Sequence, residues 1–219
     1  FQNATVRGKL NCSIFEKDTY NAVGGNLIVS EADILDEDMT ALDSSTLKIT
    51  GSATFVSGEI VRIKSGIAND EWIEITDVTN APEYSVVRDL SGNYSSDNNP
   101  VWSKGSAVVS MGFSGGGFIG IETADKTKMS IYKRNSSVWS DYDELVRIGN
   151  LNGFLSYTSE LYGLGAGNDT SYLKYDPASG LRIRGEILAT TITGGTIVGT
   201  DFKTSSSGRR IEIDSSGIT

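Results

Sequence analysis

Residues 185–219 read GEILATTITGGTIVGTDFKTSSSGRRIEIDSSGIT, and this stretch decides which folds the chain can adopt. Its isoleucines are scattered among glycine, threonine and serine without a helical period. Short strands broken by Gly-Gly and Ser-Ser-Gly bury too little apolar surface to offset a backbone ordering cost of ~1–2 kcal/mol per residue. The stretch therefore needs apolar partners from outside its own chain.

Three identical chains wound about one axis would supply these partners, because each isoleucine could then meet its symmetry mates in a continuous core. Small residues at the turns would allow the three chains to pack closely. We therefore expect a homotrimer with an intertwined, triple-stranded β shaft over residues 189–219. The side chains expected in the trimer core are Ile187, Ile192, Ile197, Phe202, Ile211 and Ile213.

The composition of the whole chain also favours strands joined by tight turns. Its 219 residues include 25 glycines and only 3 prolines, and glycine supplies the positive φ that hairpin turns require. A hydrophobic content of 38% with 21% charged residues is typical of a folded protein. We expect an all-β chain, mainly β with one short helix, in an elongated homotrimer.

A small antiparallel β-barrel is expected over residues 46–112, as a knob inserted in this trimer. Five runs rich in β-branched and aromatic residues follow one another there. Within one run, Ile73 and Ile75 oppose Glu74 and Thr76, which indicates one apolar and one polar face. The runs are TLKITG (46–51), EIVRIKSG (59–66), EWIEITDV (71–78), YSVVRDLSG (84–92) and GSAVVSMG (105–112).

An N-terminal β segment with one short acidic helix is expected over residues 1–45. Ser30 is a good helix N-cap, and acidic residues follow it in what would be the first turn. The apolar residues Ile34, Leu35, Met39 and Leu42 then recur at near-helical spacing. This pattern predicts a helix that begins after Ser30.

Residues 113–188 are expected to form a β-rich trimeric domain that contains a hairpin. The hairpin is predicted from SYLKYDPASGLRIRGEI (171–187), in which two alternating segments flank a loop with proline early and glycine late. Tyr172 and Lys174 should share one face of this hairpin, and Leu173 and Tyr175 the other.

Several of these segments resemble parts of bacteriophage tail fibre and tail-tip proteins. YLKYDPASGLRIRGEI (172–187), ITGGTIVGTDFKT (192–204) and RRIEIDSSGI (209–218) are similar to the region where a fibre head passes into a triple-stranded β shaft. The runs within 55–109 are similar to a small β knob inserted in such proteins, and RIGNLNG (147–153) and YGLGAG (162–167) look like recurrent stretches of them.

This resemblance implies a homotrimeric virion structural protein of the phage tail that contributes to host attachment. Its location would be the virion tail, outside the cell. Its partners would be other phage tail proteins and a glycan or protein receptor on the host surface.

Charge and residue content exclude several function classes. The net charge of −9 repels phosphate backbones, so no nucleic-acid partner is expected. No run approaches the ~18 apolar residues of a membrane span, so no membrane insertion is expected. Without histidine, Ser/His/Asp triads, Cys/His dyads and histidine metal sites are impossible, and Cys12 is the sole cysteine. We expect no enzyme activity, no cofactor and no metal.

Four aromatic residues are candidates for receptor contact. Tyr94 and Trp102 lie on the polar stretch 91–105, an expected surface loop, although such aromatics also close small cores. Trp139 and Tyr142 lie beside an acidic segment and could stack on a sugar. A receptor- or glycan-binding module of a tail fibre, or of a bacterial adhesin, is therefore an alternative function.

Acidic residues allow one further alternative, a glycan-degrading tailspike. A glycosidase needs two carboxylates that flank a groove, and Asp141, Asp143 and Glu144 are the densest candidates. A solvated acidic turn is the preferred explanation, because the 28 acidic residues of the chain make chance pairs common. A second acidic cluster, within EADILDEDM (31–39), lacks the glycine and terminal glutamate of a calcium-binding EF-hand loop, and a charged helical face accounts for it.

Overall fold

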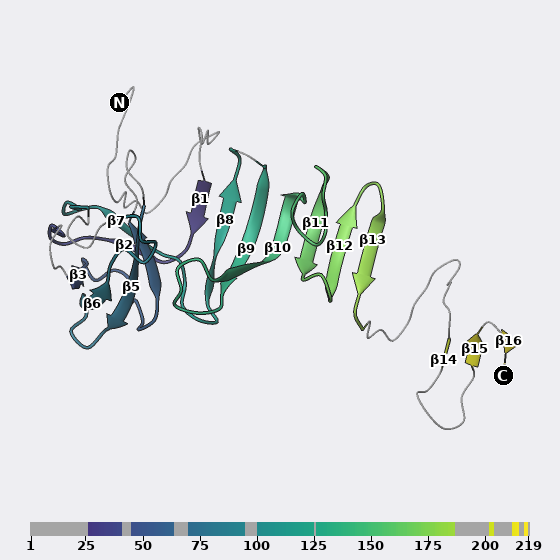
Figure 1. Cartoon of the computed structure of the whole chain (residues 1–219), viewed down its shortest axis with the longest axis horizontal. Coiled ribbons are helices and arrows are strands. Elements are labelled where there is room, and N and C mark those ends of the chain that lie inside the picture. Colours follow the sequence, from purple (N-terminus) through teal and green to yellow (C-terminus); the bar gives the residue numbers. More distant parts are fainter. Residues whose placement is uncertain are drawn as a thin grey trace. The chain divides into compact units, whose positions relative to one another are not determined.

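The computed structural model of the chain describes residues 26–40, 45–63, 70–94, 100–124 and 126–186, and three short strands between residues 202 and 218. Within these ranges it contains strands and no helix, so the prediction of an all-β chain is confirmed (Figure 1). The chain divides into two compact units, Phe1–Gly185 and Glu186–Thr219.

The first unit contains a six-stranded antiparallel sheet with the order β2-β7-β4-β5-β6-β3. The five strands expected within 46–112 are confirmed, and β2 adds an edge from an earlier part of the chain. The strands are β2 (Ala32–Ile34), β3 (Thr46–Lys48), β4 (Ile60–Ile63), β5 (Glu71–Asp77), β6 (Glu83–Val87) and β7 (Ala107–Ser110).

This sheet curls so that its two edges meet. Leu35, which follows β2, forms a β-bridge with Ile49, which follows β3. Two backbone hydrogen bonds flank the bridge, from Asp36 N to Lys48 O at 2.9 Å and from Thr50 N to Ile34 O at 3.1 Å. The edge strands are thereby joined instead of presenting unpaired backbone groups.

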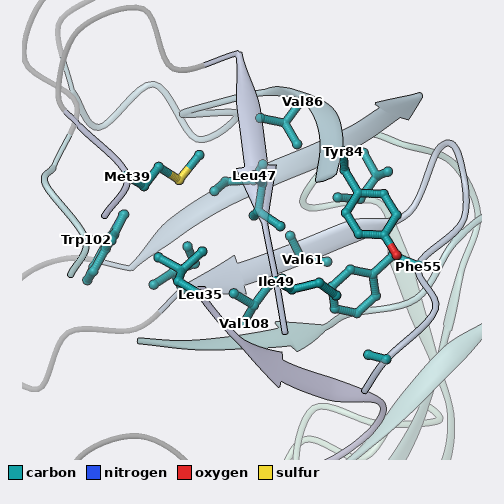
Figure 2. Packing of buried hydrophobic residues seen from close by; sticks show 14 residues of the cluster. Leu35, Met39, Leu47, Ile49, Phe55, Val61, Tyr84, Val86, Trp102 and Val108 are labelled. Atoms are coloured by element: carbon teal, nitrogen blue, oxygen red, sulfur yellow. The ribbon is translucent and has the colours of Figure 1, made fainter. Parts of the chain in front are cut away.

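The inside of the curl is an apolar core (Figure 2). Alternation along β5 places Ile73 and Ile75 in it, as the sequence predicts, and both side chains are fully buried. The other members come from β3, β4, β6 and β7 and from the segments between strands. They are Leu35, Met39, Leu47, Ile49, Ala53, Phe55, Val61, Ile63, Tyr84, Val86, Trp102 and Val108.

The predicted helix after Ser30 is wrong. This segment is extended over β2, and Leu35 and Met39 pair through β-bridges with Ile49 and Trp102. Burial alternates with a period of two, since Asp33 and Leu35 are buried while Ile34 between them is half-buried. Pairing with residues distant in the sequence therefore overrides a local spacing that suits a helix.

The first unit also contains a seven-stranded antiparallel sheet with the order β1-β8-β9-β10-β11-β12-β13. From β8 onward the strands follow one another in chain order, side by side in Figure 1. The predicted hairpin is confirmed as β12 and β13, with Asp176 paired to Gly180. The strands are β1 (Asn26–Val29), β8 (Gly117–Glu122), β9 (Lys128–Arg134), β10 (Tyr142–Asn150), β11 (Tyr162–Gly167), β12 (Tyr172–Asp176) and β13 (Gly180–Arg184).

A β-bulge interrupts the pairing of β9 with β10. Glu144 pairs with Tyr132, and Val146 pairs with the adjacent Ile131, so that Leu145 is the extra residue. A bulge of this kind places even-numbered residues before and after it on opposite faces of the sheet.

One face of the seven-stranded sheet is covered by the segment between β10 and β11. Leu151, Phe154 and Leu155 of this segment form a small buried cluster. The close contact requires glycine in β11, because a Cβ atom on Gly165 would lie 2.8 Å from the Phe154 ring and 2.9 Å from Leu155 Cδ1.

A second apolar cluster joins the two sheets of the first unit. Ile60 of β4 packs with Met111, which directly follows β7, and with Phe118 of β8. The half-buried rings of Trp72 and Tyr132 pack against these residues. Ile60 and Trp72 project from the six-stranded sheet on the side opposite to its main core, so both faces of β4 are occupied.

The second unit contains a small antiparallel sheet of three strands, β14 (Phe202–Lys203), β15 (Glu212–Asp214) and β16 (Gly217–Ile218). Phe202 pairs with Ile213, and Ile213 pairs with Ile218. Of the residues expected in a trimer core, only these first two fall on described strands. Ile187, Ile192, Ile197 and Ile211 lie outside the described residues.

Candidate functional site

The most prominent surface of the first unit is an apolar face on the seven-stranded sheet. Residues directly opposite each other in neighbouring strands share a face, so the strand register defines rows of side chains across the sheet. Two adjacent rows run through all seven strands. The first is Val29, Ile119, Ile131, Val146, Ala166, Leu173 and Ile183, and the second is Leu27, Ile121, Met129, Ile148, Leu164, Tyr175 and Leu181.

The two rows contain no charged residue, yet many of their side chains are open to solvent. Leu181 is 61% exposed and Leu27 is 56% exposed, and these two residues lie at opposite ends of one row. Ile131, Ile148 and Leu173 in the interior of the sheet are also exposed. Scattered apolar residues are normal on a protein surface, but a contiguous apolar area of this kind marks a contact surface.

The opposite face of the same sheet carries charged residues and is covered. Arg147 donates from Nε to Glu144 Oε1 at 2.7 Å, and its guanidinium lies over the Phe154 ring. Lys174 donates to the Leu155 carbonyl at 3.1 Å and lies over the rings of two tyrosines. The usual distribution, with apolar residues covered and charged residues exposed, is therefore reversed in this sheet.

The hairpin shows this reversal most clearly. Tyr172 and Lys174 share one face, and Leu173 and Tyr175 the other, as the sequence predicts. The covered side, however, is the one with Lys174 and Asp176, and both of these residues are buried.

Trp102, a predicted receptor contact, lies in the core of the six-stranded sheet. It is only 6% exposed, and its backbone exchanges hydrogen bonds of 2.7 and 2.9 Å with Met39. Its indole Nε1 donates to the buried carboxylate of Glu71, which is also paired with Arg88 at 2.7 Å. Trp102 therefore closes the core, in agreement with the alternative interpretation of this residue.

Tyr94, the other predicted contact on that loop, is half-buried. Its backbone amide donates to Asp89 Oδ2 at 3.0 Å. Burial, together with the negative charges of Glu71, Asp89 and Asp70, raises the pKa of its hydroxyl.

Trp139 and Tyr142, in contrast, belong to one aromatic group that spans the two sheets. The Trp139 ring lies 5.3 Å from that of Trp72 in β5, and the Tyr142 ring lies 5.5 Å from that of Tyr132 and 5.7 Å from that of Phe118. Sequence reasoning did not select Trp72. Trp72 lies on the face of β5 that otherwise carries polar residues, and a large aromatic residue on such a face is the signal that could have identified it.

Arg134 holds the turn that carries Trp139. Its buried guanidinium donates to the carbonyls of Met111, Val138 and Trp139 at 2.9, 2.8 and 3.2 Å. It also lies over the Tyr142 ring, with 5.6 Å between the guanidinium carbon and the ring centroid. Burial lowers the pKa of this arginine.

The three acidic residues considered for glycan cleavage all accept hydrogen bonds, and Asp141 and Asp143 share Asn135 as a donor. Asp141 accepts hydrogen bonds from Ser136 and Asn135, which lower its pKa, and Asp143 accepts one from Asn135. Burial opposes ionisation of Glu144, but hydrogen bonds from Arg147 and Ser130 outweigh it and lower the pKa. Asp141 and Glu144 therefore lack the raised pKa expected of a general acid.

The acidic residues of segment 31–39 also have partners of their own. Asp33 accepts bonds from the amides of Ser52 and Ala53 at 2.7 and 3.1 Å, and Asp36 pairs with Lys104 at 3.0 Å. In the ranges that the structure describes, no group of three or more acidic or cysteine side chains is placed to hold a metal ion.

Comparisons of the chain with models of protein families, with curated protein sequences and with solved structures find no match. A search of the described residues for a helix that is long and apolar enough to cross a membrane finds none.

Proposed function

We propose that this chain is a structural subunit of a bacteriophage tail fibre or tail tip, and that it assembles as a homotrimer. The observation that carries the proposal is the exposed apolar face of the seven-stranded sheet. Removal of apolar surface from water contributes ~25 cal/mol per Å² of favourable free energy, and a single chain does not gain this free energy while the face is exposed. Contact with further copies of the chain would recover it.

Copies related by a threefold axis suit this geometry. Three broad sheets that turn their apolar faces toward one axis would enclose a single core, and the charged faces with their covering segments would remain outside. The isoleucine-rich segment 189–219 independently needs partner chains, and the resemblance described above implies a trimer. The trimer, the inserted knob and the triple-stranded shaft are all parts of this proposal.

The role in host attachment rests on the same resemblance to tail fibres. A receptor- or glycan-binding module is the second candidate function, and the aromatic group around Trp72, Trp139 and Tyr142 favours it. For a glycan-degrading tailspike, the geometry offers no support, because Asp141 and Glu144 accept hydrogen bonds that lower their pKa values.

The mass of the protein in solution tests the assembly. Sedimentation equilibrium or multi-angle light scattering should give three times the chain mass of 23.4 kDa. The trimer should persist on dilution, as expected when a large apolar interface holds it together. A monodisperse monomer, with the apolar face open to solvent, would refute the proposed assembly, and a dimer would refute its threefold symmetry.

A further inference from the structure

A pocket of about 210 Å³ lies where the two sheets of the first unit meet. Arg62 and Trp72 line it from the six-stranded sheet, and Phe118, Glu122, Tyr132 and Tyr142 line it from the seven-stranded sheet. The pocket combines aromatic rings with one cationic and one anionic side chain.

The rings are fixed by contacts with one another. Phe118 and Tyr132 are stacked at 4.8 Å with an angle of 20° between their planes, and Tyr142 meets both rings edge-on. Trp72 is supported from outside the pocket by Trp139. These contacts give a rigid aromatic wall, which can receive the C–H side of a ligand at little cost in conformational entropy.

Arg62 supplies a hydrogen-bond donor whose position is also fixed. Its Nη1 pairs with Asp70 Oδ2 at 3.3 Å, and its guanidinium lies over the Trp72 ring at 5.5 Å. Its Nε is buried and has no hydrogen-bond partner among the residues that the structure describes. The side chain is 17% exposed, so the outer N–H groups of its guanidinium, and not Nε, are the donors available to a ligand.

Glu122 supplies acceptor oxygens in the same pocket. Its carboxylate pairs with Lys128 at 3.3 Å and is about one-third exposed. Aromatic rings that face C–H groups, with a guanidinium donor and a carboxylate acceptor beside them, match the chemistry of a saccharide. A sugar ring presents C–H groups on its faces and hydroxyls, which both donate and accept, around its edge.

From this combination we infer that the pocket binds a neutral saccharide unit. Its volume is below the ~300–1,000 Å³ of common small-molecule sites, which suits one sugar residue better than a larger cofactor. The Arg62 guanidinium disfavours a cationic ligand such as a quaternary ammonium, which aromatic pockets otherwise attract. The negative charge of the chain disfavours phosphates.

The aromatic wall of the pocket and the two apolar rows lie on opposite faces of the seven-stranded sheet, although Ile121 of the second row also lines the pocket. Phe118, Tyr132 and Tyr142 point to the charged face, whereas Ile119 and Ile131 point to the apolar one. Copies that cover the apolar rows therefore do not need to occupy the pocket. The inference goes beyond the structural role proposed above and does not depend on it.

Saturation-transfer NMR and tryptophan fluorescence on the whole chain test the inference, with glucose, galactose, N-acetylglucosamine and rhamnose as probes. At least one of these sugars should bind saturably. Arg62→Met should weaken binding by ~10-fold, the loss typical of one hydrogen bond to a charged group. Tyr142→Ala should weaken sugar binding as well. If Arg62→Met does not fold, the result for Tyr142→Ala decides the test. Arg182→Met, which changes an exposed arginine of β13, is the matched control and should bind as the unmodified chain does.

Binding of none of the four sugars would overturn the inference. So would unchanged binding in Arg62→Met and Tyr142→Ala, or displacement of the sugar by choline chloride. Light scattering on the same samples separates this result from the proposed assembly. A trimer that binds no sugar contradicts only the saccharide site, and a monomer that binds one contradicts only the trimer.

Discussion

The Tyr157 hydroxyl donates a hydrogen bond of 2.6 Å to Asp176 Oδ2 on the covered face of the seven-stranded sheet. The other carboxylate oxygen, Oδ1, accepts bonds from the amides of Ala178 and Ser179 at 3.0 and 2.6 Å, in the turn between β12 and β13. The pair therefore ties the covering segment to the hairpin. Both groups have shifted pKa values, and each shift predicts a pH dependence of stability.

Tyr157 predicts a loss of stability in alkali. Burial and the bond to Asp176 raise the pKa of Tyr157 from 10 to about 12. The protonated phenol is thus favoured in the folded state, and its contribution is complete below pH 10 and lost as the pH rises toward 12. Tyr157→Phe should be less stable at pH 8 and should lose less stability between pH 10 and 12. Urea unfolding at each pH measures this, and parallel losses in both proteins would contradict it.

Asp176 predicts a loss of stability in acid. The hydrogen bond from Tyr157, with further bonds from the turn amides, lowers the pKa of Asp176 below its ordinary value of 3.8. Its contribution is therefore present above that value and is lost as the pH falls through the lower, folded-state pKa. Asp176→Asn should be less stable than the unmodified chain at pH 7, and the two unfolding free energies should converge below pH 3. A difference that stays constant with pH would contradict the assignment.

The buried pair of Glu71 and Arg88 predicts a large effect of removing one partner. The arginine donates to both oxygens of Glu71, at 2.7 and 2.8 Å, and to the carbonyls of Thr40 and Pro100. Arg88→Met should destabilise the fold by about 3–5 kcal/mol, because it leaves a buried carboxylate without its counter-charge.

Thermal or urea unfolding followed by circular dichroism measures the change in Arg88→Met. Lys104→Met is the control, since it removes an ion pair of Asp36 whose two side chains are well exposed. It should cost at most about 1 kcal/mol. Equal effects of the two substitutions would contradict the importance of burial.

The apolar face predicts a change of assembly without a change of fold. Ile148→Asp places a charge in the middle of one apolar row, at a side chain that is 44% exposed in the single chain. In the proposed trimer this charge would be buried, so the variant should sediment as a monomer with an unchanged circular dichroism spectrum. Val87→Asp is the matched control, because Val87 is 48% exposed on the six-stranded sheet. Trimers in both variants would argue against this face as the interface.

Gly165 predicts a packing defect at the covering segment. A Cβ atom there would press against Phe154 and Leu155, so Gly165→Val should destabilise the fold by about 1–3 kcal/mol. Gly58→Asn is the control, since nothing lies within 4 Å of a Cβ at that position and asparagine tolerates its positive φ. A variant Gly165→Val as stable as the control would show that the segment can move away from the sheet.

Strands with regular alternation could be predicted from the sequence. Ile73 and Ile75 are buried, and the hairpin around Pro177 forms where proline and glycine place its loop. The segment after Ser30 was predicted wrongly, because Leu35 and Met39 have a spacing that suits a helix as well as a strand. Their bridges to Ile49 and Trp102 decide between the two, and such long-range pairs are not visible in a local pattern.

The candidate site could be predicted only in part. Trp139 and Tyr142 were selected because they lie beside an acidic segment. Tyr142 lines the pocket and Trp139 packs on Trp72 from outside it, whereas Trp72 comes to the pocket through the packing of two sheets. The reversal of the seven-stranded sheet could not be predicted at all. Alternation shows that Lys174 and Leu173 lie on different faces, but it does not show which face a distant segment covers. That choice depends on the close approach of Phe154 to Gly165.

The extra residue Leu145 divides β10 into two parts whose even-numbered side chains lie on opposite faces of the sheet. Before this residue, the side chains of Tyr142 and Glu144 lie on the charged face of the sheet. After it, the side chains of Val146 and Ile148 lie on the apolar face. Even-numbered residues therefore change from the charged face to the apolar face at this point. The number of residues in the strand, and not only their identity, decides which side chains lie on each face. Deletion of Leu145 would have one of two effects. Either the Tyr142 side chain would turn to the apolar face, where further copies of the chain are proposed to bind, or Val146 and Ile148 would turn away from the two apolar rows. A substitution here changes one side chain, whereas a deletion changes the face on which every following side chain of the strand lies.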